Sequence, residues 1–156
     1  MSTTEPHPRR IVPALSGTYD SLMPFSELLI RATIGLFLVP HGVQKLFGAF
    51  GGGGIAGTAQ GFEGMGFSPG ILWATLAGLI EFFGGLMLAV GLLTRPVAAA
   101  VTVFMAVAVF KVHWPNGFFA GNGGYEFALM WGLVALAFVI RGGGRYSVDA
   151  AIGREF

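Results

Sequence analysis

Residues 71–93 read ILWATLAGLIEFFGGLMLAVGLL, and Glu81 is the only charged residue among them. A helix rises about 1.5 Å per residue, so a run of this length crosses the roughly 30 Å hydrocarbon core of a bilayer. Other stretches have the same character when isolated ionisable residues are allowed within them, namely 25–47, 96–112 and 125–140. The sequence therefore predicts an all-α fold, an integral membrane four-helix bundle that occupies residues 25–141.

The composition supports a membrane protein and excludes several other classes. Hydrophobic residues make up 54% of the chain and charged residues 11%, whereas an ordinary soluble domain has roughly 25% charged residues. A net charge of +1 offers no attraction to nucleic acid, so lipid is the expected partner. The chain has no cysteine, which excludes disulfides, thiol redox chemistry and zinc–thiolate sites. We expect no metal site, because His41 and His113 are the only imidazoles in the predicted bundle and no HxxxH spacing occurs.

Three segments lie outside the predicted spans. Residues 1–24 contain several prolines and lack the apolar core of a signal peptide, so we expect an irregular N-terminal arm. Residues 142–156 form the C-terminal tail. The connection 48–70 is rich in glycine, and the apolar pattern in 55–66 predicts a short helix at the membrane interface, with a flexible loop as the alternative.

The distribution of basic residues predicts the orientation in the membrane. Short cytoplasmic loops carry an excess of lysine and arginine. Lys45 and Lys111 fall on one side of the predicted bundle, whereas the side that holds both termini carries Arg9, Arg10, Arg95, Arg141, Arg145 and Arg154. We therefore expect both the arm and the tail to be cytoplasmic.

Ionisable residues within the spans are candidates for chemistry, because an unpaired charge in hydrocarbon costs at least about 2.5–3.5 kcal/mol. Glu81 is the deepest of them. Its first predicted partner is Arg31, which would form a structural ion pair through a bidentate fork. The alternative places Glu81 opposite His41, and a carboxylate facing an imidazole could pass a proton inward from the outer side.

A second group of ionisable residues gathers near the outer boundary of the predicted bundle. Trp114 and Tyr125, which flank this group, are predicted to be interface anchors. The candidate ligand or proton site consists of Glu81 and this outer cluster, which comprises His41, Lys45, Lys111, His113 and Glu126. The cluster either pairs charges to close the bundle or forms a pocket for a quinone, whose carbonyl oxygens would accept hydrogen bonds above an apolar slot.

The order and spacing of five short motifs resemble the DoxX family of small bacterial membrane proteins. The motifs are LIRATIG at 29–35, HGVQKL at 41–46, AGLIEFFGG at 77–85, GLLTR at 91–95 and GGRYSVD at 143–149. The resemblance implies a four-helix protein of the bacterial inner membrane that serves as a subunit or companion of a membrane oxidoreductase rather than as a stand-alone enzyme. It also implies contact with other membrane subunits of a redox complex and with quinone. The alternatives are a non-catalytic carrier, an assembly factor or a structural subunit that binds another membrane protein.

Overall fold

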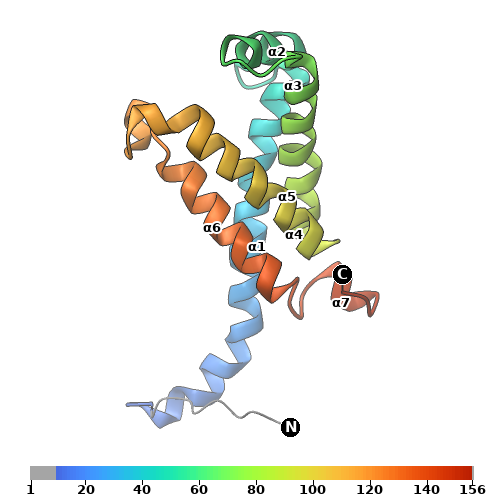
Figure 1. Ribbon diagram of the computed structural model, residues 1–156. Coiled ribbons are helices and arrows are strands. Elements are labelled where there is room, and N and C mark those ends of the chain that lie inside the picture. Colours follow the sequence, from blue (N-terminus) through green and yellow to red (C-terminus); the bar gives the residue numbers. More distant parts are fainter. Residues whose placement is uncertain (1–9, 156) are drawn as a thin grey trace.

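The computed structural model describes residues 10–155, and within this part of the chain the secondary structure is entirely helical. The all-α prediction is therefore confirmed. The α-helices labelled in Figure 1 are α1 (Ser16–Phe47), α2 (Gly54–Gly64), α3 (Gly70–Leu79), α4 (Gly85–Val90), α5 (Thr94–Val107), α6 (Glu126–Arg141) and α7 (Val148–Ala151). Two π-helices interrupt this series, η2 (Ile80–Gly84) between α3 and α4 and η3 (Ala108–His113) after α5.

Three continuous helical stretches are long and apolar enough to cross a membrane. They are Pro13–Phe47, Gly70–Val90 and Thr94–Asn116, and they correspond to the first three predicted spans. Helix α6 coincides with the fourth predicted span, but its 16 residues are only about 24 Å long, less than the roughly 30 Å hydrocarbon core. A crossing by α6 therefore stays a prediction.

Helix α1 begins earlier than the sequence pattern indicates. The expected irregular arm ends at Pro24, whereas α1 starts at Ser16, and the first nine residues of that arm lie outside the described residues. Pro24 lies inside the helix, where its ring removes one backbone donor and crowds the carbonyl four residues earlier, a defect that bends a helix and need not end it. The 32 residues of α1 extend for about 48 Å, longer than a bilayer core. Figure 1 shows its N-terminal part projecting beyond the other helices.

The helices form two hairpins that meet at one end and diverge at the other (Figure 1). In the first hairpin α1 packs along α3, η2 and α4, and in the second α5 packs along α6. Leu38 of α1 is buried against the second hairpin, in a core cluster with Val101, Met105 and Ala135. The core therefore joins the hairpins at mid-length, and α2 lies at the divergent end, which we call the α2 end. The opposite end, where α7 lies, is the α7 end.

Small residues allow α1 to approach α4 closely. A Cβ atom added to Gly35 would lie 2.5 Å from the carbonyl oxygen of Gly85 and 2.6 Å from the backbone nitrogen of Ala89. No side chain fits between two backbones at that separation. Close contact of this kind is how helices associate in lipid, where burial of apolar surface provides no driving force.

The connection between α1 and α3 contains the expected short helix, α2, over Gly54–Gly64. Its Glu63 carboxylate accepts a hydrogen bond of 3.1 Å from the backbone N–H of Gly70, the first residue of α3. This contact satisfies one of the backbone donors that a helix leaves free at its N-terminus. It also holds α2 across the end of the first hairpin.

Candidate ligand-binding site

A cavity of about 660 Å³ lies between the two hairpins near the α2 end. Its volume is within the range of roughly 300–1,000 Å³ that is typical of small-molecule sites. The lining comes from α1, α2, η2, α5, η3 and α6 and is mainly apolar, with Leu38, Phe62, Met65, Phe104, Met105, Phe127 and Trp131 among its residues. Four ionisable side chains also line it, namely His41, Lys45, Glu81 and His113.

Lys45 and Glu81 form an ion pair at this cavity. The Lys45 Nζ atom lies 2.6 Å from Oε2 of Glu81. The Glu81 side chain is only 7% exposed and that of Lys45 is 24% exposed. An isolated carboxylate at this depth would be unstable, and the nearby ammonium group offsets part of the cost of burying it.

The predicted ion pair between Arg31 and Glu81 is not formed, because the two residues lie at different levels of the hairpin. Gly42 is the α1 residue opposite Phe82, since an added Cβ there would lie 2.4 Å from the Phe82 backbone nitrogen. Gly42 lies about 11 residues beyond Arg31, or roughly 16 Å along the helix. The prediction failed because a single sequence does not give the register of α1 against η2, which brings Lys45 and not Arg31 to Glu81.

Two histidines from different helices reach the cavity. The His41 ring packs edge-on against Trp131, with ring centroids 5.9 Å apart. The Nδ1 atom of His113 lies 2.8 Å from the carbonyl oxygen of Gly123. Because a carbonyl can only accept, Nδ1 carries the proton, and in the neutral ring Nε2 is then an acceptor.

The remaining members of the predicted outer cluster do not join these side chains. Lys111 is exposed and does not line the cavity. The Glu126 carboxylate accepts a hydrogen bond of 3.0 Å from the backbone N–H of Ala120 and so stabilises the connection before α6. Trp114 and Tyr125 stack on each other with ring centroids 5.0 Å apart, at the tip of the second hairpin.

The π-helices coincide with the polar residues of the cavity. Glu81 lies in η2, and His113 is the last residue of η3. A π-turn inserts an extra residue into the helix and is frequently found at functional sites. Here it occurs once in each hairpin, at the level of the cavity.

Arg31 instead belongs to a polar cluster at the α7 end. It is fully buried, and its guanidinium donates to the carbonyl oxygens of Leu88 (3.1 Å) and Tyr146 (2.6 Å). Gly91 makes room for it, because an added Cβ there would lie 1.9 Å from Arg31 Nη1. These hydrogen bonds connect the end of α4 to the C-terminal segment, residues 142–155.

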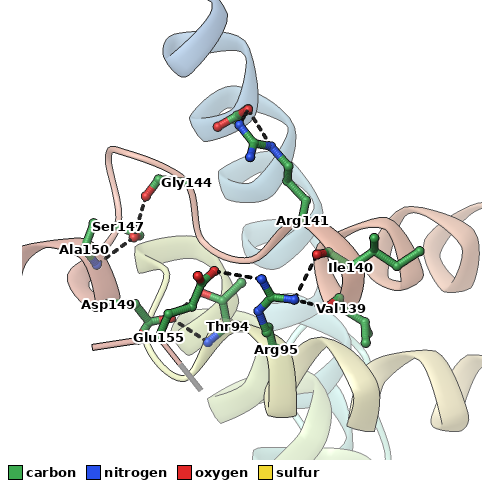
Figure 2. Close-up of polar contacts among 11 residues, drawn as sticks. Thr94, Arg95, Val139, Ile140, Arg141, Gly144, Ser147, Asp149, Ala150 and Glu155 are labelled. Carbon is green, nitrogen blue, oxygen red and sulfur yellow. Dashed lines mark hydrogen bonds and ion pairs between the residues drawn. The ribbon is translucent and has the colours of Figure 1, made fainter. Parts of the chain in front are cut away.

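Asp149 holds the same segment to the start of α5 (Figure 2). Its carboxylate accepts hydrogen bonds from the backbone N–H groups of Leu93 and Thr94, both 2.8 Å, and from the Thr94 hydroxyl, 2.7 Å. Burial alone would raise the pKa of Asp149, but these three hydrogen bonds and the charge of Arg31 outweigh it and lower the pKa below its ordinary value. Leu93 has a left-handed φ of 48°, and the bond from Asp149 helps to hold it there.

Three residues with defined roles in the structure were not predicted, namely Trp131 at the cavity and Asp149 and Thr94 at the α7 end. Asp149 and Thr94 belong to two of the motifs that carry the DoxX resemblance, so the motifs contained a signal for them. Trp131 had no such signal, because an aromatic residue in an apolar span has the same pattern whether it faces lipid or a cavity.

Among residues 10–155, no three His, Asp or Glu side chains gather in a way that could hold a metal ion.

Together these features define a helical membrane protein with an apolar cavity that contains a buried ion pair. The chain belongs to the DoxX family, whose model matches residues 26–114. An uncharacterized protein of Haemophilus influenzae is 32% identical over 137 residues, which cover 83% of this chain and 92% of that protein. The uncharacterized membrane protein Rv3486 of Mycobacterium tuberculosis is 27% identical over 146 residues, 85% of this chain and 84% of that one. No solved structure matches the chain.

Proposed function

We propose that this chain is a membrane subunit or companion of an oxidoreductase system and that it binds a quinone in the cavity at the α2 end. The observation that carries the proposal is the combination of a cavity of about 660 Å³ with a mainly apolar lining and convergent polar groups from both hairpins. A quinone has an apolar ring and tail and two carbonyl acceptors, which is the polarity that such a site recognises.

The lining residues supply each contact that a quinone head requires. The Lys45 ammonium group and the His41 ring are the donors available to a carbonyl oxygen, and Trp131 and Phe127 offer aromatic faces for the ring. When the His113 ring is neutral, its Nε2 atom is an acceptor for the hydroxyl group of the reduced form. An apolar lining is less suited to a path for a polar solute, which favours this proposal over the carrier interpretation.

A substitution that fills the cavity tests the proposal. Gly61 lines the cavity, and an added Cβ there would meet nothing within 4 Å. Gly61→Leu should therefore fold normally and abolish saturable binding of menadione, a soluble naphthoquinone. Binding is measured as quenching of Trp131 fluorescence in a variant whose other tryptophans, Trp73 and Trp114, are replaced by phenylalanine.

Gly57→Leu is the matched control. Gly57 lies in the same helix with nothing within 4 Å of an added Cβ, but it does not line the cavity. We expect this variant to bind menadione as the parent does. His41→Gln should weaken binding by about 0.5–1.5 kcal/mol, the value of one hydrogen bond. If Gly61→Leu and Gly57→Leu bind equally well, or if the parent shows no saturable quenching, the quinone proposal is wrong.

We further propose that the protein lies in the bacterial inner membrane with four crossings and with both termini in the cytoplasm. The support is the excess of basic residues at the α7 end. Cysteine variants test this orientation cleanly because the chain has no cysteine of its own. Ile152→Cys and Phe119→Cys replace side chains that are 53% and 68% exposed at opposite ends of the bundle. In intact cells an impermeant maleimide should label the Phe119→Cys variant and leave the Ile152→Cys variant unlabelled, and the opposite labelling would reverse the orientation.

A further inference from the structure

A second cleft lies at the α7 end, remote from the proposed quinone site. The C-terminal segment folds back beside the end of α6 and leaves a volume of about 310 Å³. Three arginines line this cleft, namely Arg141, Arg145 and Arg154. Two carboxylates, Asp149 and Glu155, line it as well.

The carboxylates around the cleft already have partners. Asp149 accepts its three hydrogen bonds from Leu93 and Thr94. Glu155 pairs with Arg95 at 3.3 Å, as Figure 2 shows. Glu27 of α1 accepts a hydrogen bond of 2.8 Å from Arg141.

Two arginines of the cleft are left without a carboxylate partner among the described residues. Arg154 is exposed, and Arg145, also exposed, has its guanidinium 5.8 Å from the centre of the Tyr146 ring. In and beside the cleft, five arginines therefore accompany three carboxylates. The arginines are Arg31, Arg95, Arg141, Arg145 and Arg154, and the carboxylates are Glu27, Asp149 and Glu155. The excess positive charge lies on Arg145 and Arg154.

The position of the cleft indicates the source of its counter-ion. Arg141 is the last residue of α6, so the cleft lies where the apolar part of the bundle ends, and Tyr146 and Ile152 beside it are exposed. With α6 crossing the membrane, as proposed above, this end of the bundle lies at the level of lipid headgroups. Guanidinium groups bind phosphate oxygens through paired hydrogen bonds, and basic pockets at this level bind anionic lipids.

We propose that Arg145 and Arg154 bind a phosphate group in this cleft, and that an anionic phospholipid headgroup supplies it. The site is independent of the quinone proposal, because it shares no lining residue with the cavity at the α2 end. A soluble phosphate ion offers the same chemistry, so the test separates the two sources.

The test measures the thermal unfolding temperature of the full chain in detergent while phosphatidylglycerol, phosphatidylcholine or inorganic phosphate is titrated. Phosphatidylglycerol at about 100 times its Kd should raise the unfolding temperature by roughly 5–10 °C, and phosphatidylcholine should not. Replacing both arginines, Arg145→Gln with Arg154→Gln, should weaken the phosphatidylglycerol response at least about tenfold. The fold should survive, because both side chains are exposed.

The control is the double variant Arg10→Gln, Lys111→Gln, which removes two positive charges that do not line the cleft. It should respond to phosphatidylglycerol as wild type does. A response of wild type to inorganic phosphate that is lost in the Arg145 and Arg154 variant would keep the phosphate site and make its source a soluble ion. Equal shifts with phosphatidylcholine and phosphatidylglycerol would overturn the proposal. So would an equal loss of response in the control variant, or an unchanged response after replacement of Arg145 and Arg154.

Discussion

Glu81→Gln is expected to lower the free energy of unfolding in detergent by about 3–5 kcal/mol, because it leaves the Lys45 ammonium group without its counter-charge inside the bundle. The two groups are 2.6 Å apart, and the Glu81 side chain is almost fully buried. Lys45→Met should cost at least as much, since it leaves the more deeply buried Glu81 carboxylate without its counter-charge. The double variant should be more stable than the sum of the single changes predicts, with a coupling of roughly 0.5–3 kcal/mol.

The same measurement with Arg31 provides the control. Arg31 is buried and donates to Leu88 and Tyr146, so Arg31→Met should also destabilise the protein. Its effect should add to that of Glu81→Gln, because the two residues lie at different levels and share no hydrogen-bond or ion-pair partner among residues 10–155. Coupling between Arg31 and Glu81, together with additivity between Lys45 and Glu81, would contradict the pairing seen in the structure.

The fold class could be predicted from the sequence because it depends on length and hydrophobicity, which are properties of each segment alone. The stretch around Glu81 is apolar over enough residues to cross a bilayer, and this does not depend on which helices pack against it. It forms the continuous helical stretch Gly70–Val90. The start of α1 could not be predicted in this way. Ser16–Pro24 contains polar residues and a proline, and its helical state depends on continuation from the apolar part.

The candidate site could be predicted only in part, because it depends on how one helix is positioned along another. His41, Lys45, Glu81 and His113 were selected as ionisable residues within apolar spans or at their outer ends, and all four line the cavity. Their partners depend on contacts such as that of Gly42 with Phe82, which set the register of α1 against η2. A single sequence does not show which glycine faces which backbone, and for that reason Glu81 was assigned to Arg31.

Asp149→Ala is expected to lower the free energy of unfolding by about 3–5 kcal/mol, because the change removes the anion beside buried Arg31 and leaves two backbone donors unsatisfied. The loss should also free the C-terminal segment, so trypsin should cleave after Arg145 faster than in wild type. Glu155→Gln is the matched control. Its carboxylate pairs with Arg95 at the surface, where the side chain is 50% exposed, and such a pair contributes only about 0–1 kcal/mol.

The pH dependence of the unfolding free energy separates the stabilising contribution of the Asp149 charge from that of its packing. Because its pKa in the folded protein is lowered, the stabilising contribution of Asp149 is fully present above its unfolded pKa of about 3.9 and is lost as the pH falls through the lower, folded value. Asp149→Asn keeps the size of the side chain but cannot ionise. The difference in unfolding free energy between wild type and this variant should therefore be constant from about pH 7 down to about pH 5 and shrink below about pH 4. A difference that stays constant to pH 2 would show that packing, and not the charge that faces Arg31 and the start of α5, is what Asp149 contributes.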